Sequence, residues 1–301
     1  MEQFGYIRAA TVAEAVALLN EPGLNSCPLA GSTDLLLQIR HESSTGTPKR
    51  TDLPRRVVDI SLIPELRRID RQRDWVTIGA AATFSDVLDS PIVAQTAAVL
   101  VEACRQVGAV QIRNMGTLGG NVANAAACAD SLPALICLDA VAHFITATGE
   151  QSLPVCELVI GPNHTILPKG GLLVSLSYPI PLPGSRSTFL KLGRRNAMAI
   201  SRLTVAALGR LRPDGRIAEV RLAAGSATPH IVRLEAVERE LVGTKPGPEL
   251  YQAAGKLAAD EMVRQAGRRW SSEFKVPALI AMTARAFTRI FEPENGTQEE
   301  R

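Results

Sequence analysis

Residues 111–121 read QIRNMGTLGGN, and a run of small residues then leads to Cys128-Ala129-Asp130-Ser131. Glycines gathered between two apolar segments allow backbone N–H groups to come close to a phosphate. We call residues 116–121 the second glycine segment, because a similar stretch precedes it in the chain. The pattern predicts a phosphate-binding loop, so the rest of the chain is expected to fold around a phosphate-containing ligand.

The first glycine segment comprises residues 30–35 and reads AGSTDL. The apolar Pro28-Leu29 precedes it, and an apolar-rich helix start follows from Leu35. A strand, a tight turn and a helix N-terminus together offer oriented N–H donors and a positive dipole end to an anion. Two segments of this kind suit a diphosphate.

Neither segment matches the common nucleotide-binding motifs. The dinucleotide fingerprint requires G-x-G-x-x-G at a helix start with an acidic residue about 20 positions later, and the nucleoside triphosphate loop requires Gly-Lys-Ser/Thr. Both patterns are absent from the two segments. A tight turn is the alternative for each segment and would be favoured for a lone Gly-Gly pair. Two segments, each flanked by small polar residues, favour phosphate binding.

The composition indicates a globular protein of two domains, because 301 residues exceed what one hydrophobic core usually serves. The net charge of +3 is small and the basic residues are scattered, which argues against a nucleic acid partner. The five cysteines include no C-x-x-C pair, so we expect no disulfide framework and no metal site built by this chain. Without a signal sequence or an apolar run of membrane length, we expect no membrane insertion and a cytoplasmic location.

The hydrophobic pattern divides the chain near residue 180, where the Pro-rich residues 179–184 indicate a linker. Thr11 and Glu14 fit a capping box at a helix start. Before the linker, the pattern predicts strands at 57–60, 76–79, 142–146 and 172–178, a short helix at 84–88, and one long helix from Pro91 to about Val107. After it, the pattern predicts strands at 187–192, 199–211 and 217–224, and helices at 232–241, 248–259 and 276–291. Residues 41–54 read as an exposed loop and 292–301 as a polar tail.

The chain resembles the FAD-binding medium subunits of the molybdenum hydroxylases, a family that includes xanthine dehydrogenases, carbon monoxide dehydrogenase and relatives acting on aldehydes and N-heterocycles. The resemblance covers Phe4 to about Phe291 and rests on five motifs, at residues 30–35, 78–83, 111–121, 130–135 and 191–195. Residues 29–40, 78–92 and 270–274 are most similar to bacterial xanthine dehydrogenase flavin subunits.

The resemblance implies an α+β fold. A p-cresol methylhydroxylase-type FAD-binding domain of two α+β subdomains is expected at residues 1–178, and a C-terminal α+β domain with an antiparallel sheet and helices at 185–291. It implies FAD as the cofactor and no catalytic side chain. The residues carried over as FAD-binding are Ala30, Gly31, Ser32, Thr33, Asp34, Leu35, Thr117, Gly119, Gly120, Asn121, Asp130, Leu173 and Lys191.

Three of these residues have roles that differ from phosphate binding. Asp130 would accept hydrogen bonds from sugar or ribityl hydroxyls, although a helix N-cap is an equal alternative. Lys191 would lie near the flavin and steady negative charge on the reduced ring, the alternative being an exposed strand lysine. Leu173 would contact the ring system, the alternative being a core leucine.

Two sequence features qualify the resemblance. Ser32 stands where many members carry a second glycine, and serine is compatible with binding unless the position needs a positive φ. The chain between Asn121 and Asp130 lacks the cysteine-bearing insertion with which some members bind an extra iron–sulfur cluster, so no such cluster is expected.

The resemblance also implies partners and a reaction. Substrate would be hydroxylated at a molybdenum cofactor in a large subunit, and electrons would cross two two-iron two-sulfur clusters in a small subunit. FAD on this chain would pass them to NAD, a quinone or oxygen, within a dimer of heterotrimers. The substrate alternatives are xanthine, another N-heterocycle, an aldehyde or carbon monoxide. An autonomous FAD-dependent oxidoreductase and a non-enzymatic nucleotide-binding module are the competing interpretations.

Overall fold

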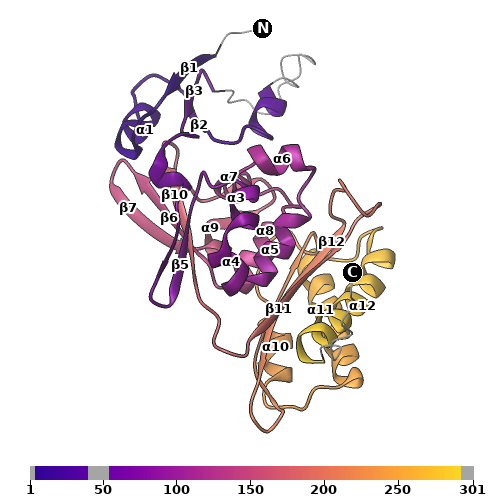
Figure 1. The fold of residues 1–301 in the computed structure, drawn as a ribbon. Coiled ribbons are helices and arrows are strands. Elements are labelled where there is room, and N and C mark those ends of the chain that lie inside the picture. The colour runs from indigo at the N-terminus through magenta and orange to yellow at the C-terminus, as the bar shows by residue number, and fades with distance from the viewer. Residues whose placement is uncertain (1–3, 40–53, 293–301) are drawn as a thin grey trace.

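A computed structural model describes residues 4–39 and 54–292. The N-terminal unit, drawn in indigo in Figure 1, is a small parallel sheet in the order β1-β3-β2 with a helix beside it. Its elements are β1 (Gly5–Arg8), α1 (Val12–Leu19), β2 (Ser26–Leu29) and β3 (Arg56–Asp59). Val58 of the central strand and Ala15 of the helix lie in one small apolar core. The predicted strand at 57–60 is therefore present, one residue earlier than expected.

Helix α1 begins with a cap that differs in one bond from the predicted capping box. The Thr11 Oγ1 atom accepts from the N–H of Glu14 at 3.1 Å, as expected. The Glu14 carboxylate accepts from the N–H of Ala10 at 2.7 Å, rather than from that of Thr11. The prediction of a reciprocal capping box was thus wrong, because the Glu14 carboxylate reaches one residue further back along the chain.

The middle unit is a five-stranded antiparallel sheet in the order β4-β5-β10-β6-β7, with helices on one face (Figure 1). The strands are β4 (Ile69–Gln72), β5 (Trp75–Gly79), β6 (Val141–Thr146), β7 (Gly149–Pro154) and β10 (Leu172–Pro179). The helices are η1 (Pro64–Arg67), α3 (Phe84–Asp89), α4 (Pro91–Thr96), α5 (Ala98–Arg105), α6 (Val110–Met115), α7 (Leu118–Asn124), α8 (Ser131–Cys137) and α9 (Val155–Leu158). The short strands β8 (Val159–Gly161) and β9 (His164–Thr165) pair with each other. Alternate strand residues such as Val76, Ile78 and Leu176 face the helices and form the main core.

The long helix predicted from Pro91 to Val107 is wrong, because the chain breaks it into α4 and α5. Ala97 has φ −145° and ψ 63°, which no helix contains, while its N–H still bonds to the Val93 carbonyl. The break allows Val93 and Val99 to face the same core from two directions. Alanine carries no sequence signal for such a break.

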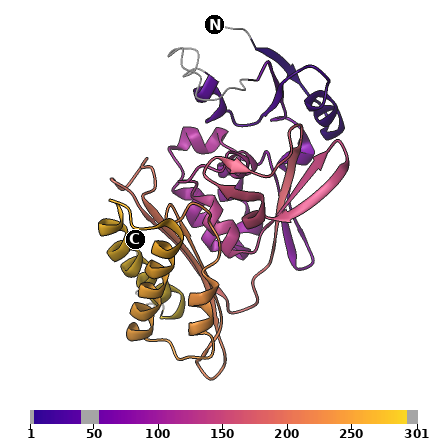
Figure 2. The ribbon, with the colours of Figure 1, turned by 180° about the vertical axis from the view of Figure 1, so that it is seen from behind.

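The C-terminal unit is a three-stranded antiparallel sheet, β11-β12-β13, with helices on one face (orange and yellow in Figure 1, and from behind in Figure 2). Its elements are β11 (Arg186–Leu192), β12 (Leu203–Leu211), β13 (Ile217–Gly225), α10 (Glu235–Leu241), α11 (Pro248–Ala266) and α12 (Ser272–Phe291). The strand predicted from residue 199 begins only at Leu203, because residues 193–202 form the connection from β11. The α+β class and the antiparallel C-terminal sheet are confirmed.

The C-terminal sheet lies between two layers of helices. Ala206 and Leu208 belong to the core shared with the middle unit, whereas Val205 and Ala207 belong to the core under α11 and α12. Both faces of β12 are therefore buried, which explains its almost continuous apolar sequence. The contact between the units is a packed interface rather than a linker alone.

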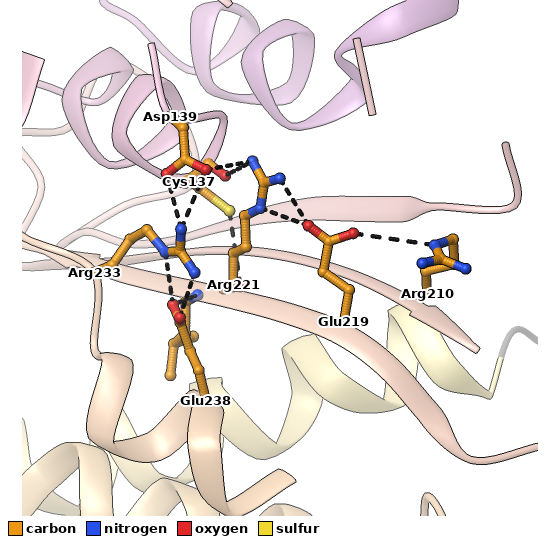
Figure 3. A network of polar contacts seen from close by, with 8 residues as sticks. Cys137, Asp139, Arg210, Glu219, Arg221, Arg233 and Glu238 are labelled. Atoms are coloured by element: carbon orange, nitrogen blue, oxygen red, sulfur yellow. Dashed lines mark hydrogen bonds and ion pairs between the residues drawn. The ribbon is translucent and has the colours of Figure 1, made fainter. Parts of the chain in front are cut away.

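A charge network fixes the same interface at its edge (Figure 3). Asp139, just after α8, binds Arg221 of β13 at 2.8 Å and Arg233 at 2.9 Å. Arg221 also binds Glu219 at 2.7 Å, and Arg233 binds the buried Glu238 at 2.5 Å. Each arginine thus joins two carboxylates, and the network connects the helix layer of the middle unit to the C-terminal sheet.

Two sequence predictions fall on residues outside the described ranges. These are most of the loop predicted at 41–54 and the polar tail after Glu292. Among the described helices, none combines the length and the apolar character needed to cross a membrane.

Candidate functional site

The first glycine segment connects strand β2 to helical residues 35–39 through a sharp turn. Ser32 adopts φ +64°, the left-handed conformation that usually favours glycine. Gly31 lies directly against the chain before α7, where an added Cβ would overlap the Met115 carbonyl and come within 2.8 Å of Gly116 Cα. The two glycine segments therefore touch through backbone atoms, which requires glycine at position 31.

The N–H groups of residues 31–34 lack an intramolecular acceptor in the part of the chain that the structure describes. The helical bonds here begin later, with the N–H of Leu36 donating to Ser32 at 3.3 Å and that of Gln38 donating to Asp34 at 3.0 Å. Unpaired N–H groups ahead of a helix are the donors that an anion requires. This segment fits a phosphate group.

The second glycine segment was predicted as a loop of exposed N–H groups, and the structure shows a helix start instead. Leu118 donates to the Ala82 carbonyl at 2.9 Å and Gly119 to the Ala80 carbonyl at 3.0 Å. Gly120 donates to Thr117 Oγ1 at 3.0 Å, so Thr117 is the N-cap of α7. These N–H groups are already paired within the protein.

The two glycines of this segment have different environments. A Cβ on Gly119 would lie 2.5 Å from the Cβ of Ala80, so glycine is required for α7 to approach the chain after β5. Gly120 is exposed, and an added Cβ would contact only Thr117. The glycines thus permit close packing on one side and leave bare backbone on the other.

Asn124 connects the ends of the two segments. Its Nδ2 donates to Asp34 Oδ2 at 3.2 Å, and its Oδ1 accepts from Gln38 Nε2 at 3.4 Å. The contact places the helical residues after the first segment beside the end of α7. Sequence reasoning missed Asn124, because an amide after a glycine pair carries no distinctive pattern.

Asp130 and Lys191 form a buried ion pair between the middle and C-terminal units. Lys191 Nζ donates to Asp130 Oδ2 at 2.6 Å and to the Gln106 carbonyl at 2.9 Å. Ser201 Oγ donates to the other carboxylate oxygen at 2.5 Å. Burial raises the pKa of Asp130 above its ordinary value, although Lys191 and Ser201 both lower it.

The pair excludes one alternative for each residue, whereas the contacts of both residues with FAD stay predictions. Asp130 occupies the N-cap position of α8 but makes no side-chain cap bond, so the capping interpretation is wrong. Lys191 is buried in β11, so the interpretation as an exposed strand lysine is also wrong. Each side chain instead satisfies the charge of the other.

Cys128 lies two residues before Asp130 in the chain, and its half-buried thiol has a raised pKa. Burial is the largest cause, the carboxylates of Asp130 and Asp34 raise the pKa further, and Lys191 lowers it. At the second segment, Asn121 Oδ1 accepts from Ser131 Oγ at 2.7 Å, directly beside Asp130.

Leu173 lies in β10, opposite Phe144, and is buried in the main core. The next residue, Val174, accepts from the N–H of Ala80, which also contacts Gly119. Leu173 is thus a core leucine near the second segment, and its contact with a ring system stays a prediction.

Within the described residues, no group of three or more His, Cys, Asp or Glu side chains could hold a metal ion. His143 bonds to Ser177 at 2.7 Å and His230 to the Cys156 carbonyl at 2.7 Å, both away from the glycine segments. Sequence reasoning missed Ser201, because its link to Asp130 spans 71 positions and has no motif.

Known proteins resemble the chain over almost its full length. It matches the FAD binding domain in molybdopterin dehydrogenase over residues 2–181 and the CO dehydrogenase flavoprotein C-terminal domain over residues 188–290. It is 30% identical over 294 residues to the xanthine dehydrogenase FAD-binding subunit of Escherichia coli O157:H7, covering 97% of each chain. It is 28% identical over 288 residues to the glyceraldehyde dehydrogenase medium chain of Sulfolobus acidocaldarius, covering 96% of this chain and 98% of that one.

A solved structure of carbon monoxide dehydrogenase from Hydrogenophaga pseudoflava superposes with a TM-score of 0.86 at 27% identity, over 95% of this chain and 96% of that chain. The similarity thus extends over the fold and over both matched family domains. The chain belongs to the FAD-binding medium subunits of the molybdopterin dehydrogenases and is the flavoprotein subunit of a molybdenum-containing oxidoreductase.

Proposed function

We propose that the first glycine segment binds the diphosphate of FAD and that the flavin extends toward the pair Asp130–Lys191. The observation that carries this proposal is that the N–H groups of residues 31–34 have no acceptor in the described chain, at a turn where Gly31 packs against Met115 and Gly116. Backbone donors at a helix start bind phosphate without the charge repulsion that a carboxylate would add. Helix α7 joins the two regions, because its Asn124 bonds to Asp34 and its Asn121 bonds to Ser131 beside Asp130.

The other residues predicted to bind FAD have supporting roles in this proposal. Ala30 and Leu35 delimit the turn, while the hydroxyls of Ser32 and Thr33 offer further hydrogen bonds to phosphate oxygens. Asp34 contributes its backbone, since its carboxylate is held by Asn124. Thr117, Gly119, Gly120 and Asn121 set the approach of α7. FAD, when bound, supplies the redox chemistry, and this chain binds and orients it.

We propose that electrons arrive from two two-iron two-sulfur clusters of a small partner subunit and leave to NAD, a quinone or oxygen. Substrate would be hydroxylated at a molybdenum cofactor in a large subunit, and the assembly would be a dimer of heterotrimers. Exposed apolar side chains on α6 and on the β11–β12 connection support a protein partner near the site: Val110, Ile112, Met115, Met198 and Ile200.

Xanthine or another N-heterocycle is the substrate class we propose first, because the xanthine dehydrogenase FAD-binding subunit is among the relatives with the highest identity. The names of other relatives make an aldehyde or carbon monoxide the alternatives.

We propose that the chain has two domains, an FAD-binding domain at residues 1–178 and a C-terminal domain at residues 185–291. Among the described residues, Cys104, Cys128, Cys137 and Cys156 are thiols outside any disulfide, which favours a reducing compartment, and we propose a cytoplasmic location.

The first experiment is the visible absorbance spectrum of the purified chain, followed by acid release and identification of the chromophore. We expect flavin absorbance and one FAD per chain. A folded, colourless chain that cannot be reconstituted with FAD would contradict it. Coexpression with the iron–sulfur and molybdenum subunits, followed by metal analysis of the purified complex, then tests the partners. Substrate oxidation by this chain alone would favour an autonomous oxidoreductase instead.

A further inference from the structure

We propose that Ser201 is a positioning residue that holds Asp130 opposite Lys191 at the flavin end of the site. The inference rests on the proposed function, because only that function places the pair beside FAD. The two carboxylate oxygens of Asp130 have separate donors from the C-terminal unit: Lys191 Nζ at 2.6 Å and Ser201 Oγ at 2.5 Å. With one donor on each oxygen, the carboxylate plane is fixed rather than free to rotate.

Burial makes the hydroxyl of Ser201 important for the charge of the pair. Asp130 is 5% exposed and Ser201 is 6% exposed, so water cannot readily replace a lost donor. The other titratable groups facing Asp130 are Cys104 of α5 and Cys128, and burial raises the pKa of both thiols. Lys191 and Ser201 are therefore the two groups that favour the ionised carboxylate.

The backbone around Ser201 is itself held to the chain that leads to Asp130. Ser226 Oγ lies 3.0 Å from the Ala127 carbonyl and 3.2 Å from the Ser201 carbonyl, so it can donate to either. Ser226 has φ +56°, and its carbonyl accepts from Lys275 Nζ at 2.5 Å. A positive φ is uncommon for a residue other than glycine, and these bonds hold Ser226 in it. The contacts of Ser226 thus keep Ser201, just before β12, close to Ala127.

By holding Asp130 in place, Ser201 would set the net charge of the Asp130–Lys191 pair next to the flavin. With Asp130 ionised, the pair is neutral overall and the lysine cation is held between Asp130 and the Gln106 carbonyl. Loss of the Ser201 hydroxyl would favour protonation of Asp130, leaving an unbalanced positive charge. Positive charge near the ring favours the reduced flavin, so its reduction potential would rise.

The test compares Ser201→Ala and Ser201→Thr in the purified full chain. The matched control is Ser185→Ala, because the Ser185 hydroxyl is buried and has no hydrogen-bond partner in the described structure. Two quantities are measured: the reduction potential of bound FAD between about pH 6 and pH 9, and the urea stability of the FAD-free chain over the same range.

For Ser201→Ala we expect a more positive potential at low pH that converges with the unaltered chain at high pH, and an altered pH profile of stability. Ser201→Thr should restore both profiles, and Ser185→Ala should leave both unchanged. Profiles of Ser201→Ala that match the unaltered chain would overturn the inference. A chain without FAD would instead contradict the proposed function, and the stability profile of the FAD-free protein would then decide whether Ser201 controls Asp130.

Discussion

The two glycine segments both combine glycine with small polar residues, but their backbones are used differently. In the first, the left-handed turn at Ser32 leaves the N–H groups of residues 31–34 without acceptors in the described chain. In the second, the N–H groups of Leu118, Gly119 and Gly120 are all paired within the protein. Glycine at 119 serves close packing on Ala80 rather than exposure of a donor. A glycine-rich stretch therefore does not by itself identify an anion-binding backbone.

The two regions are therefore expected to have different roles: the first binds FAD, and the second sets the charge near the flavin. The first segment offers unpaired donors and carries the proposed diphosphate site. The second segment leads into α8 and the buried pair Asp130–Lys191, whose charged side chains bond to each other and to Ser201. Variants in the first region are thus expected to change FAD affinity, and variants in the second to change stability and potential.

The strongest test of the comparison is Gly31→Ala. The new Cβ would overlap the Met115 carbonyl and push the two segments apart, so we expect FAD affinity to fall roughly 1000-fold, or about 4 kcal/mol. Fluorescence titration of the FAD-free chain measures the dissociation constant. Gly161→Ala is the control, because a Cβ there meets open space. Unchanged affinity in Gly31→Ala would remove the first segment from the site.

Lys191→Ala tests the second region and should destabilise the chain by about 3 kcal/mol near neutral pH, because it leaves a buried carboxylate unpaired. The pKa of Asp130 already lies above its ordinary value in the folded state, since burial outweighs Lys191 and Ser201. Folding therefore favours the protonated form, and stability falls as the pH rises through the folded-state value. Without Lys191 that pKa rises further, so the destabilisation should grow with pH.

Urea unfolding of Lys191→Ala at several pH values measures this dependence, with the exposed Lys256→Ala as the control. FAD should remain bound to Lys191→Ala, and its reduction potential should fall because a cation near the ring is lost. A destabilisation that does not vary with pH would argue against the coupling of Lys191 to Asp130. An unchanged potential would remove Lys191 from the flavin environment.

Much of the fold could be predicted, because buried apolar residues recur at the regular spacing of strands and helices. The alternation in β10 and the apolar face of α12 predicted both elements to within a few residues. The break at Ala97 could not be predicted, because neither proline nor glycine marks it and packing of Val93 and Val99 decides it. The helix at Leu118–Asn124 was also missed, since Gly119-Gly120 disfavours a helix until Ala80 and the Thr117 cap stabilise it.

The candidate site, like the fold, could be predicted from the sequence only in part. Sequence reasoning named Asp130 and Lys191 separately, but a pairing across 61 positions depends on how β11 packs against α8 and is not readable from spacing. It also raised the question of a positive φ at Ser32, which the structure answers with +64°. Binding of FAD by the thirteen residues carried over stays a prediction.

Thr117→Ala tests the second segment and has a smaller expected effect. Loss of the N-cap should cost about 1 kcal/mol of stability, while FAD affinity should fall less than about tenfold, because the paired N–H groups are not the main phosphate donors. Thr11→Ala is the matched control, since Thr11 caps α1 with a similar bond. Thermal unfolding and FAD titration measure both quantities. A 100-fold loss of affinity in Thr117→Ala alone would make the second segment the primary phosphate site.

The smallest expected effect belongs to Asn124→Ala, which removes the side-chain contacts between the two regions. The bonds to Asp34 and Gln38 are long, at 3.2 and 3.4 Å, and partly exposed, so together they should contribute about 0.5–1 kcal/mol. FAD affinity should fall about two- to fivefold, because the first segment can then move relative to α7. Asn20→Ala is the control, since Asn20 joins α1 to Gly170 instead. Equal FAD affinities in the two variants would show that the Gly31 backbone contact alone sets the spacing of the segments.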